Sequence, residues 1–554
     1  MSLRIVAALI ALVIVGAAVF FVTRSDEEQP ASEKIAGAER VLESNDWLER
    51  ACALPEDELV RLWRGHHPVH SEDITTVPLE PNYSGSFAVT SHSGPWDYLQ
   101  NVPLVFYGPG HIDSIGPVDD PASVADIYPT VGQITGVPLP ARDGKPLRNA
   151  IEGDNERPKL IVLVVWDGVG RNVLEHWEGR WPNLARLERG GASYLEASVG
   201  SSPSITPATH ATMGTGSFPV DHGVTAIEFR DETGAVRGIF PGRDPSDLEL
   251  STYADEIDVA LGNEPLVGTL AWKSWHMGMM GHGAQLPGGD ADHLALIGSD
   301  QRLTGNDAFY STPEYLVEFP GLVERAEELD RSDGEADGKW RGRDVLEQHD
   351  NPAWVKWQTD ALLAMLDREG YGTDDSPDLF FTNYKPTDIV AHQHNMDSPE
   401  MGDALQAQDD ALGDLVDFLD EKVGDYVVIV TADHGNTPPP QRSGAWPLLQ
   451  GQLAEDIDAH FQVPNDTSLV RQTSAAGPFI RRDVAKELGV TMGDIAEFLN
   501  GYTIGDNYPE ARLPAGYEAR ADENVLAAAF PSDQIGAVLE CALGSRRPPR
   551  SFRA

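Results

Sequence analysis

The chain has 554 residues, which is long enough for a large hydrophobic core and for more than one domain. Its 88 acidic residues outnumber its 41 basic residues and give a formal net charge of −47. Because a surface of this sign repels phosphate backbones, the composition excludes a nucleic-acid-binding surface and predicts a well-hydrated acidic exterior.

An apolar run, IVAALIALVIVGAAVFFV, occupies residues 5–22. Its length is near the lower limit for a membrane-spanning helix, and it also suits a cleaved signal peptide. We expect an uncleaved transmembrane helix within residues 1–24, because the run continues past the small residues at 16–18 that would allow cleavage. We therefore predict a single-pass protein of the cell membrane whose bulk lies outside the cytoplasm, or a secreted protein if the segment is removed.

Residues 25–80 predict a polar tether followed by a helical stretch at 46–66, which Pro55 divides. This stretch contains Cys52, one of only two cysteines in the chain, and the other is Cys541. In an oxidising compartment such a pair favours one disulfide, whereas two unrelated buried thiols are the alternative.

Short elements follow as far as a polar linker at residues 141–158. Apolar runs predict strands at 87–92 and 102–108. Residues 126–136 predict a helix that has a proline near its start and ends at a glycine.

Strands and helices alternate from residue 158 onward, and this pattern predicts an α/β fold with a mainly parallel central sheet and helices on both faces. Residues 225–350 interrupt the alternation with a loop-rich region that contains acidic stretches. The predicted strands cover 160–166, 378–384 and 425–435 (the last with its loop), and the predicted helices cover 182–191, 352–370 and 399–424, with another opening at TPATHATMGTG.

Residue types that bind metal ions follow several of these strands. Asp167 ends strand 160–166, and Asp433 and His434 end strand 425–435. Asp388 and His392 are four positions apart, so one helical turn would point both side chains at the same ion. The carboxyl ends of parallel strands meet at one edge of a sheet, which is where α/β proteins place their sites. Singly these residues are typical of caps and cores; together they predict a site for Zn²⁺ or Mn²⁺.

Thr206 lies in the segment SITPATH, shortly before two glycines. A hydroxyl activated by a metal ion could attack phosphorus or sulfur and form a covalent ester. Thr206 is also a good N-cap for the helix that opens there. Both interpretations stay open, because a helix N-terminus also favours a bound anion.

These motifs resemble those of the alkaline phosphatase superfamily, especially its type I phosphodiesterase/nucleotide pyrophosphatase branch. The similarity covers most of residues 158–440 and implies an alkaline-phosphatase-like sandwich fold. It also implies an enzyme that hydrolyses a small phosphate ester with a Thr nucleophile and two metal ions. The matching residues are Asp167-Gly168, Thr206 with His210, Thr215-Gly216, Pro219 with His222-Gly223, Asp388 with His392, and Ala432 to Gly435.

By this resemblance, Asp167, Thr206, Asp433 and His434 would surround one ion. Asp388 and His392 would hold the other, together with a histidine that the family supplies late in its chain. Downstream of His434 there is only His460, which has no motif around it.

Residues 91–147 resemble the family's usual C-terminal segment, and His92 takes the place of the missing ligand. We therefore infer a circular permutation in which residues 81–150 are the displaced module. Residues 158–445 are then the main core, with 225–350 inserted, and residues 446–554 are an extension that closes it. Termini of compact domains often lie close together, which makes such a rearrangement tolerable. A disulfide between Cys52 and Cys541 would tie the two sides of the cut together.

The sequence departs from the family pattern at one position that bears on activity. The pyrophosphatase branch has an Asn there that helps to hold a phosphoryl oxygen, and this chain has Ile227. Arg230 or a backbone N–H could replace that donor and bind substrate. A catalytically impaired envelope binding protein is therefore one alternative. A sulfate or phosphonate ester hydrolase is another, although Thr206 argues against a sulfatase, because sulfatases of this superfamily use a residue derived from Cys or Ser.

Overall fold

The computed structural model describes residues 44–151, 157–347, 349–510 and 512–548. The apolar segment at 5–22 and most of the predicted tether lie outside these ranges. Within them, none of the helices combines the length and the apolar character that crossing a bilayer requires.

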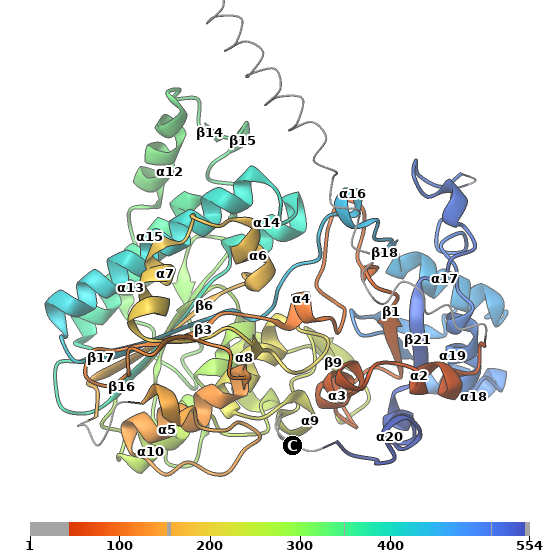
Figure 1. Ribbon diagram of the computed structural model, residues 1–554, viewed down its shortest axis with the longest axis horizontal. Helices are drawn as coiled ribbons and strands as arrows, with labels where there is room; N and C mark the ends of the chain where they lie inside the picture. The colour runs from red at the N-terminus through yellow and green to blue at the C-terminus, as the bar shows by residue number, and fades with distance from the viewer. Residues whose placement is uncertain (1–43, 152–156, 348, 511, 549–554) are drawn as a thin grey trace, which may run out of the picture. The chain divides into compact units, whose positions relative to one another are not determined.

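A nine-stranded mixed sheet forms the centre of the fold (Figure 1). Its five central strands run parallel, as the sequence predicted, whereas antiparallel pairs appear toward both edges and make the sheet mixed. The strands in spatial order are β13 (Leu303–Thr304), β12 (His293–Ile297), β11 (Val267–Ala271), β16 (Asp378–Tyr384), β6 (Leu160–Trp166), β17 (Tyr426–Thr431), β3 (Leu104–Tyr107), β7 (Ala192–Tyr194) and β4 (Gly116–Val118).

Every residue of β6, β16 and β17 is buried, which explains why these segments read as continuous apolar runs rather than as alternating ones. Helices cover both faces of the sheet. Figure 1 shows α13 (Pro352–Glu369) and α15 (Pro399–Lys422) on one side, and α5 (Ile127–Thr135) and α10 (Tyr253–Ala260) on the other.

The long predicted helices begin and end within two residues of their expected limits. In α13, the Asn351 side chain accepts a hydrogen bond from the Ala353 N–H, and Pro352 occupies the first turn, where it needs no partner for its nitrogen. The helix ends at Gly370, whose φ of 82° only glycine adopts without strain. Local cap residues therefore explain why this element could be predicted from sequence.

The predicted strand at 87–92 is wrong. Apart from a single bridge between Ser86 and Val89, the segment has no strand pairing. Instead, Phe87 packs against Trp446, with the two ring centroids 5.3 Å apart. The Thr90 hydroxyl donates a hydrogen bond to the Ala391 carbonyl (2.5 Å). The polar groups of this loop bond to other parts of the fold rather than to a neighbouring strand.

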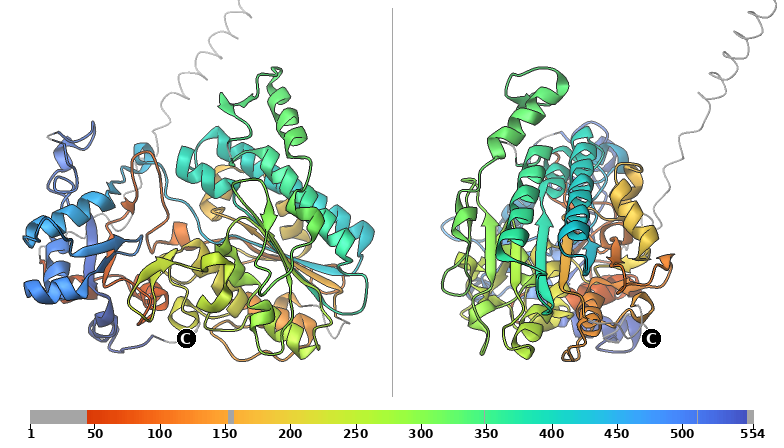
Figure 2. Two further views of the ribbon diagram at one scale, coloured as in Figure 1. Left: turned by 180° about the vertical axis from the view of Figure 1, so that it is seen from behind. Right: turned by 90° about the vertical axis from the view of Figure 1, so that its left-hand side faces the viewer.

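Residues 446–531 pack with residues 47–84, beside the main sheet in the left-hand view of Figure 2. Strand β1 (Ile74–Pro78) pairs antiparallel with β21 (Leu526–Pro531), so the two ends of the described chain share one ladder. The clusters around this ladder have their own buried apolar residues, among them Leu59 and Trp446.

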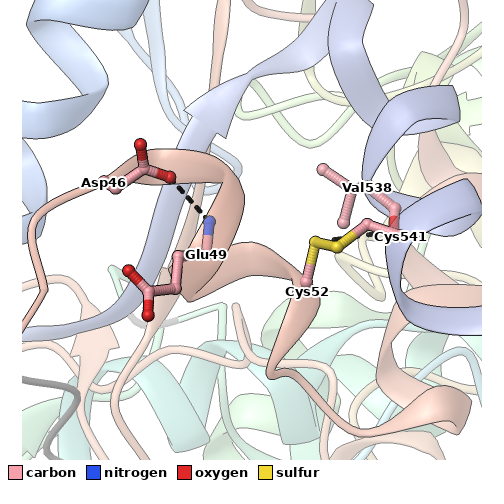
Figure 3. Close-up of a disulfide and its surroundings, with 5 residues drawn as sticks. All are labelled: Asp46, Glu49, Cys52, Val538 and Cys541. Carbon is pink, nitrogen blue, oxygen red and sulfur yellow. Dashed lines mark hydrogen bonds between the residues drawn. A yellow bond between two sulfur atoms is a disulfide. The ribbon is translucent and has the colours of Figure 1, made fainter.

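A disulfide joins Cys52 to Cys541 (Figure 3). Cys52 is the last residue of α2 (Trp47–Cys52), and Cys541 lies on α20 (Ile535–Leu543). Their Cα atoms are 5.8 Å apart, within the usual range for a disulfide. Asp46 caps the N-terminal end of α2 by accepting a hydrogen bond from the Glu49 N–H (2.8 Å), and Cys52 lies at the opposite end of this short helix. The predicted cysteine pairing is therefore present.

Candidate metal centre

Three neighbouring parallel strands bring polar side chains to one edge of the sheet. Strand β6 lies between β16 and β17. Asp167 follows β6 directly, Lys385 follows β16, and Asp433 comes two residues after the end of β17. Because the register pairs Tyr384 with Trp166, Asp167 and Lys385 are level with each other. The expected collection of site residues at the carboxyl ends of parallel strands is thus observed.

One group of ligand atoms surrounds a single oxygen, Asp388 Oδ1. Asp388 and His392 lie on α14 (Pro386–His394), and His392 Nε2 is 3.3 Å from this oxygen. His434 Nε2 lies 3.7 Å from it, and His92 Nε2 lies 3.9 Å from it. The His92 and His434 rings are stacked with their centroids 3.4 Å apart. Four predicted ligands from three distant parts of the sequence therefore converge.

Backbone carbonyls orient two of these rings. His92 Nδ1 donates to the Ser204 carbonyl (2.6 Å), and His392 Nδ1 donates to the Thr90 carbonyl (2.5 Å). A carbonyl only accepts, so the proton is on Nδ1 in both rings and each Nε2 can offer its lone pair. Histidines that bind metals are commonly held in this way. The loop at 87–92 thus contains one predicted ligand, His92, and orients another, His392.

A second group of candidate ligand atoms includes the same atom, His434 Nε2. This atom is 3.6 Å from Asp167 Oδ1 and 3.5 Å from Asp433 Oδ2. Gly168 has a φ of 72°, and its N–H donates to Asp433 Oδ1 (2.9 Å). The Asp-Gly motif therefore combines a carboxylate with a backbone turn that orients the neighbouring carboxylate.

Lys385 lies inside this arrangement, although the sequence did not single it out. Its Nζ is 2.9 Å from Asp167 Oδ1, 2.8 Å from Asp388 Oδ2 and 3.3 Å from the Thr206 hydroxyl. Burial acts to lower the pKa of Lys385, but the two carboxylates raise it above its ordinary value. Its position directly after β16 and three residues before Asp388 is the signal that would have found it.

The buried acidic groups at this site outnumber the positive groups that contact them. Burial acts to raise the pKa of Asp167 and of Asp388, but Lys385 holds both well below the ordinary range. Burial and the neighbouring Asp167 raise the pKa of Asp433 well above it. Three carboxylates thus face one ammonium. Asp388 Oδ1, Asp433 Oδ2 and His434 Nε2 are buried without a hydrogen-bond partner. Orphaned atoms of these types fit divalent metal ions.

Thr206 is the first residue of α8 (Thr206–Thr215), and its hydroxyl makes no capping bond. One turn later, His210 Nδ1 donates to the Thr206 carbonyl (2.7 Å). The Asn383 amide donates both to His210 Nε2 (3.0 Å) and to Asp167 Oδ2 (3.1 Å). This chain of bonds fixes the start of α8 against the ends of β16 and β6, and it leaves the Thr206 hydroxyl available.

The loop-rich region 225–350 also reaches the centre, which the sequence motifs did not indicate. His276 is fully buried, and its Nε2 lies 3.5 Å from Asp167 Oδ2. Lys273 Nζ lies 4.3 Å from the centroid of the Trp275 ring, and Lys385 Nζ lies 5.9 Å from the same centroid. Burial lowers the pKa of Lys273 below its ordinary value, and the charge on Lys385 lowers it further. Two ammonium groups therefore lie near one indole, and one of them, Lys385, also contacts the Thr206 hydroxyl.

Arg230 is not brought to this centre, contrary to our expectation that it binds substrate. Its guanidinium forms a buried ion pair with Asp73 and donates to the Ile480 carbonyl (3.3 Å). These contacts tie strand β9 (Glu228–Arg230) to the part of the chain that packs around β1. Arg230 therefore satisfies a buried carboxylate within the fold, and the donor next to the Thr206 hydroxyl is Lys385 instead.

Comparison with known proteins gives related sequences and similar structures. The chain is 24% identical over 448 residues to alkaline phosphatase PhoV of Synechococcus elongatus, and this match covers 67% of this chain and 79% of PhoV. It is 22% identical to alkaline phosphatase PhoD of Zymomonas mobilis, in a match that covers 56% of this chain and 58% of PhoD. It is 23% identical to alkaline phosphatase PafA of Elizabethkingia meningoseptica, in a match that covers 50% of this chain and 60% of PafA. A crystal structure of wild-type PafA superposes with a TM-score of 0.49 at 15% identity over 68% of this chain and 85% of that chain.

The family described as "Type I phosphodiesterase / nucleotide pyrophosphatase" matches residues 161–472. The match includes Asp167, Thr206, Asp388 and Asp433 and spans more than half of the 554 residues. The chain therefore belongs to the type I phosphodiesterase/nucleotide pyrophosphatase family of the alkaline phosphatase superfamily, and it is a phosphoric ester hydrolase.

Proposed function

We propose that this protein is an exported, metal-dependent hydrolase of phosphate esters that uses Thr206 as its nucleophile. The observation that carries the proposal is the position of the Thr206 hydroxyl. It is 3.3 Å from Lys385 Nζ, and that ammonium also contacts both Asp167 and Asp388, one carboxylate from each group of ligand atoms. A reacting group placed on Thr206 would therefore face both groups of ligand atoms.

Two divalent ions, Zn²⁺ or Mn²⁺, are the proposed cofactors. Asp167, Thr206, Asp433 and His434 would hold one ion. Asp388, His392 and His92 would hold the other. When bound, such ions supply a Lewis acid and lower the pKa of a coordinated hydroxyl or water.

The residues of the chain position the ester and the nucleophile. The N-terminus of α8 favours an anion beside Thr206, and the Lys385 ammonium next to the Thr206 hydroxyl adds positive charge there. Attack by Thr206 Oγ1 on phosphorus would break the bond to the leaving alcohol and leave a phosphothreonine ester. Water would then hydrolyse that ester and restore Thr206.

Phosphate monoesters are the first substrate class to test, because PhoV, PhoD and PafA are all named alkaline phosphatases. The family description also includes phosphodiesters and nucleotide pyrophosphates. The pair Lys273 and Lys385 favours a monoester, since a terminal phosphoryl group carries more negative charge than a diester and gains more from two nearby ammonium groups.

We further propose that residues 81–150 are the family's C-terminal module, moved to the front by circular permutation. Three contacts support this assignment. His92 joins the ligand group around Asp388, the Leu99 carbonyl accepts a hydrogen bond from the Gly435 N–H (2.9 Å), and β3 pairs antiparallel with β17. A displaced module would have to make contacts of this kind with the last metal-binding motif.

Export is proposed from the disulfide, because disulfides persist in oxidising compartments outside the cytoplasm. Residues 1–24 would then serve as a membrane anchor or as a cleaved signal segment.

The test is hydrolysis of p-nitrophenyl phosphate and of bis-p-nitrophenyl phosphate by the purified protein, with and without a chelator, beside Thr206→Ala. We expect turnover that the chelator removes, that added Zn²⁺ or Mn²⁺ restores, and that the variant lacks. Turnover that survives in both the chelated protein and the variant would contradict the proposal.

A further inference from the structure

A second group of carboxylates lies outside the candidate metal centre. Asp258 is on α10, and Asp290 and Asp292 directly precede β12. One carboxylate oxygen from each residue lies within 4.8 Å of the other two. Asp258 and Asp292 are only 4% and 9% exposed, whereas Asp290 is exposed to solvent. Two buried carboxylates therefore share one small space that opens to solvent at Asp290.

No positive group on the described residues compensates these carboxylates. Asp258 Oδ1 is buried and has no hydrogen-bond partner. Burial, together with the charges of Asp290 and Asp255, raises the pKa of Asp258 to about 7. Burial and the same set of carboxylates also raise the pKa of Asp292 well above its ordinary value. An uncompensated buried carboxylate is costly, so a bound cation would remove a substantial penalty.

A neighbouring imidazole, that of His282, is already engaged. His282 Nδ1 contacts Asp255 Oδ2 (2.8 Å), and its Nε2 contacts the Leu248 carbonyl (3.0 Å). Asp255 also accepts hydrogen bonds from the backbone N–H groups of His282 and Thr252. This neighbouring pair is therefore satisfied internally and does not supply a counter-charge to Asp258.

Asn263 offers one more oxygen between the two segments that carry the carboxylates. Its backbone N–H donates to the Asp258 carbonyl (2.9 Å), and its side-chain amide donates to the Gly288 carbonyl (3.0 Å). Its Oδ1 atom is buried without a partner. Asn263 thus links the end of α10 to the glycine turn that leads into Asp290, and it adds an unsatisfied oxygen to the same region.

We propose that Asp258, Asp290 and Asp292 form a calcium site that is separate from the candidate metal centre. The ligand atoms are all oxygen, and the cluster includes neither thiolate nor imidazole. Hard cations prefer such an all-oxygen set of donors. Ca²⁺ binds six to eight oxygens at about 2.3–2.6 Å, so it tolerates oxygens up to 4.8 Å apart on opposite sides of the ion. Mg²⁺ requires a tighter octahedron. Solvent at Asp290 provides an entry path and water ligands.

Calcium at this position would join α10 to the start of β12. Helix α10 packs against α8, the helix that begins with Thr206. The ion would therefore stabilise the helix that packs against α8, and it would contribute no group to the reaction.

The first test is isothermal titration of Ca²⁺ into the full chain after the metal centre has been saturated with Zn²⁺. We expect one Ca²⁺ site in the wild-type protein, its loss in Asp258→Asn and in Asp290→Asn, and its retention in Asp307→Asn. Asp307 is an exposed carboxylate outside the cluster. Because Asp290 is exposed, Asp290→Asn leaves the buried core unchanged, and a loss of Ca²⁺ binding in this variant would not come from a disrupted core. Absence of Ca²⁺ binding to the wild-type protein, or equal binding by all variants, would overturn the proposal.

Thermal melting gives an independent readout. With a calcium chelator present, Asp258→Asn should melt at the same temperature as the wild-type protein or higher, because the variant removes a buried charge that has no partner. With Ca²⁺ in excess, the melting temperature of the wild-type protein should rise and that of the variant should not. Equal rises in both proteins would place the stabilising ion elsewhere and overturn the assignment.

Discussion

The Lys385 ammonium lies 2.9 Å from Asp167 Oδ1, where it contacts one of the residues proposed to hold a metal ion. On its other side it contacts Asp388 Oδ2, which leaves Asp388 Oδ1 to the histidines. Lys385 is therefore compatible with an ion on the histidine side and competes with an ion between Asp167 and Asp433.

We predict that Lys385→Met binds Zn²⁺ or Mn²⁺ more tightly than the wild-type protein. A unit charge about 4 Å away contributes a few kcal/mol at an effective dielectric near 20, so the affinity at the Asp167 subsite should rise more than about tenfold. Isothermal titration measures this change. In the metal-free state the variant should lose about 3 kcal/mol of stability, because Asp167 and Asp388 lose their buried partner.

Lys356→Met, which removes an exposed lysine from α13, is the control for the loss of a positive charge. Unchanged metal affinity in Lys385→Met would show that Lys385 does not compete with the ion.

We predict that Thr206→Ala lowers the rate of ester hydrolysis by at least about 10³-fold, as expected when the nucleophile is removed. Thr206→Ser should keep part of the activity, because it keeps a hydroxyl at the same position. The melting temperature should change little, since Lys385 is the only side-chain partner of the Thr206 hydroxyl among the described residues. An alanine variant that retains most of its activity would rule out Thr206 as the nucleophile.

We predict that His92→Ala lowers the metal content of the purified protein from two ions toward one. His92 Nε2 faces Asp388 Oδ1, and its Nδ1 is already bound by the Ser204 carbonyl. Elemental analysis after dialysis measures the stoichiometry. His460→Ala is the matched control, because His460 is exposed and is the only histidine downstream of His434. If His460→Ala loses the ion and His92→Ala does not, the permutation is contradicted.

A pH effect is expected at Glu72. Burial, together with the neighbouring Asp73, raises its pKa from 4.5 to about 7. A carboxyl whose pKa is higher in the folded state favours folding when it is protonated. The contribution of Glu72 to the free energy of unfolding is therefore present at low pH and is lost as the pH rises toward 7. Glu72→Gln should therefore gain stability relative to the wild-type protein between about pH 5 and pH 8, by on the order of 3 kcal/mol.

The measurement is the difference in melting temperature between Glu72→Gln and the wild-type protein at each pH. Glu264→Gln, at an exposed position, should show a constant difference. Parallel curves for Glu72→Gln and the wild-type protein would show that Glu72 does not titrate in this range.

Local signals explain what could be predicted from the sequence. Strands β6, β16 and β17 are buried on both faces, so their apolar runs were visible, and Asp167 and Asp433 follow their ends. The spacing of Asp388 and His392 on one helical turn was equally local. The motif resemblance then placed His92 next to them, and the structure brings them together.

The remaining features depend on which segments meet in space. The segment 87–92 has an apolar, β-branched character, but the fold offers it no neighbouring strand, so it forms a loop that orients His392. Strand β3 was visible as an apolar run, yet its antiparallel pairing with β17 and β7 depends on how these segments meet in space. Lys385 and His276 lie in no motif that was singled out, and only the packing of β16 and the inserted region brings them to Asp167.

The bond between Cys52 and Cys541 also turns almost the whole described chain into one covalent ring. The two cysteines are 489 positions apart, and every proposed metal-binding residue lies between them. A protease that cuts once in the exposed segment 331–339 would open this ring without dividing the molecule. Such nicked protein would migrate as one species on a denaturing gel without reductant, and it would separate into two fragments only after reduction.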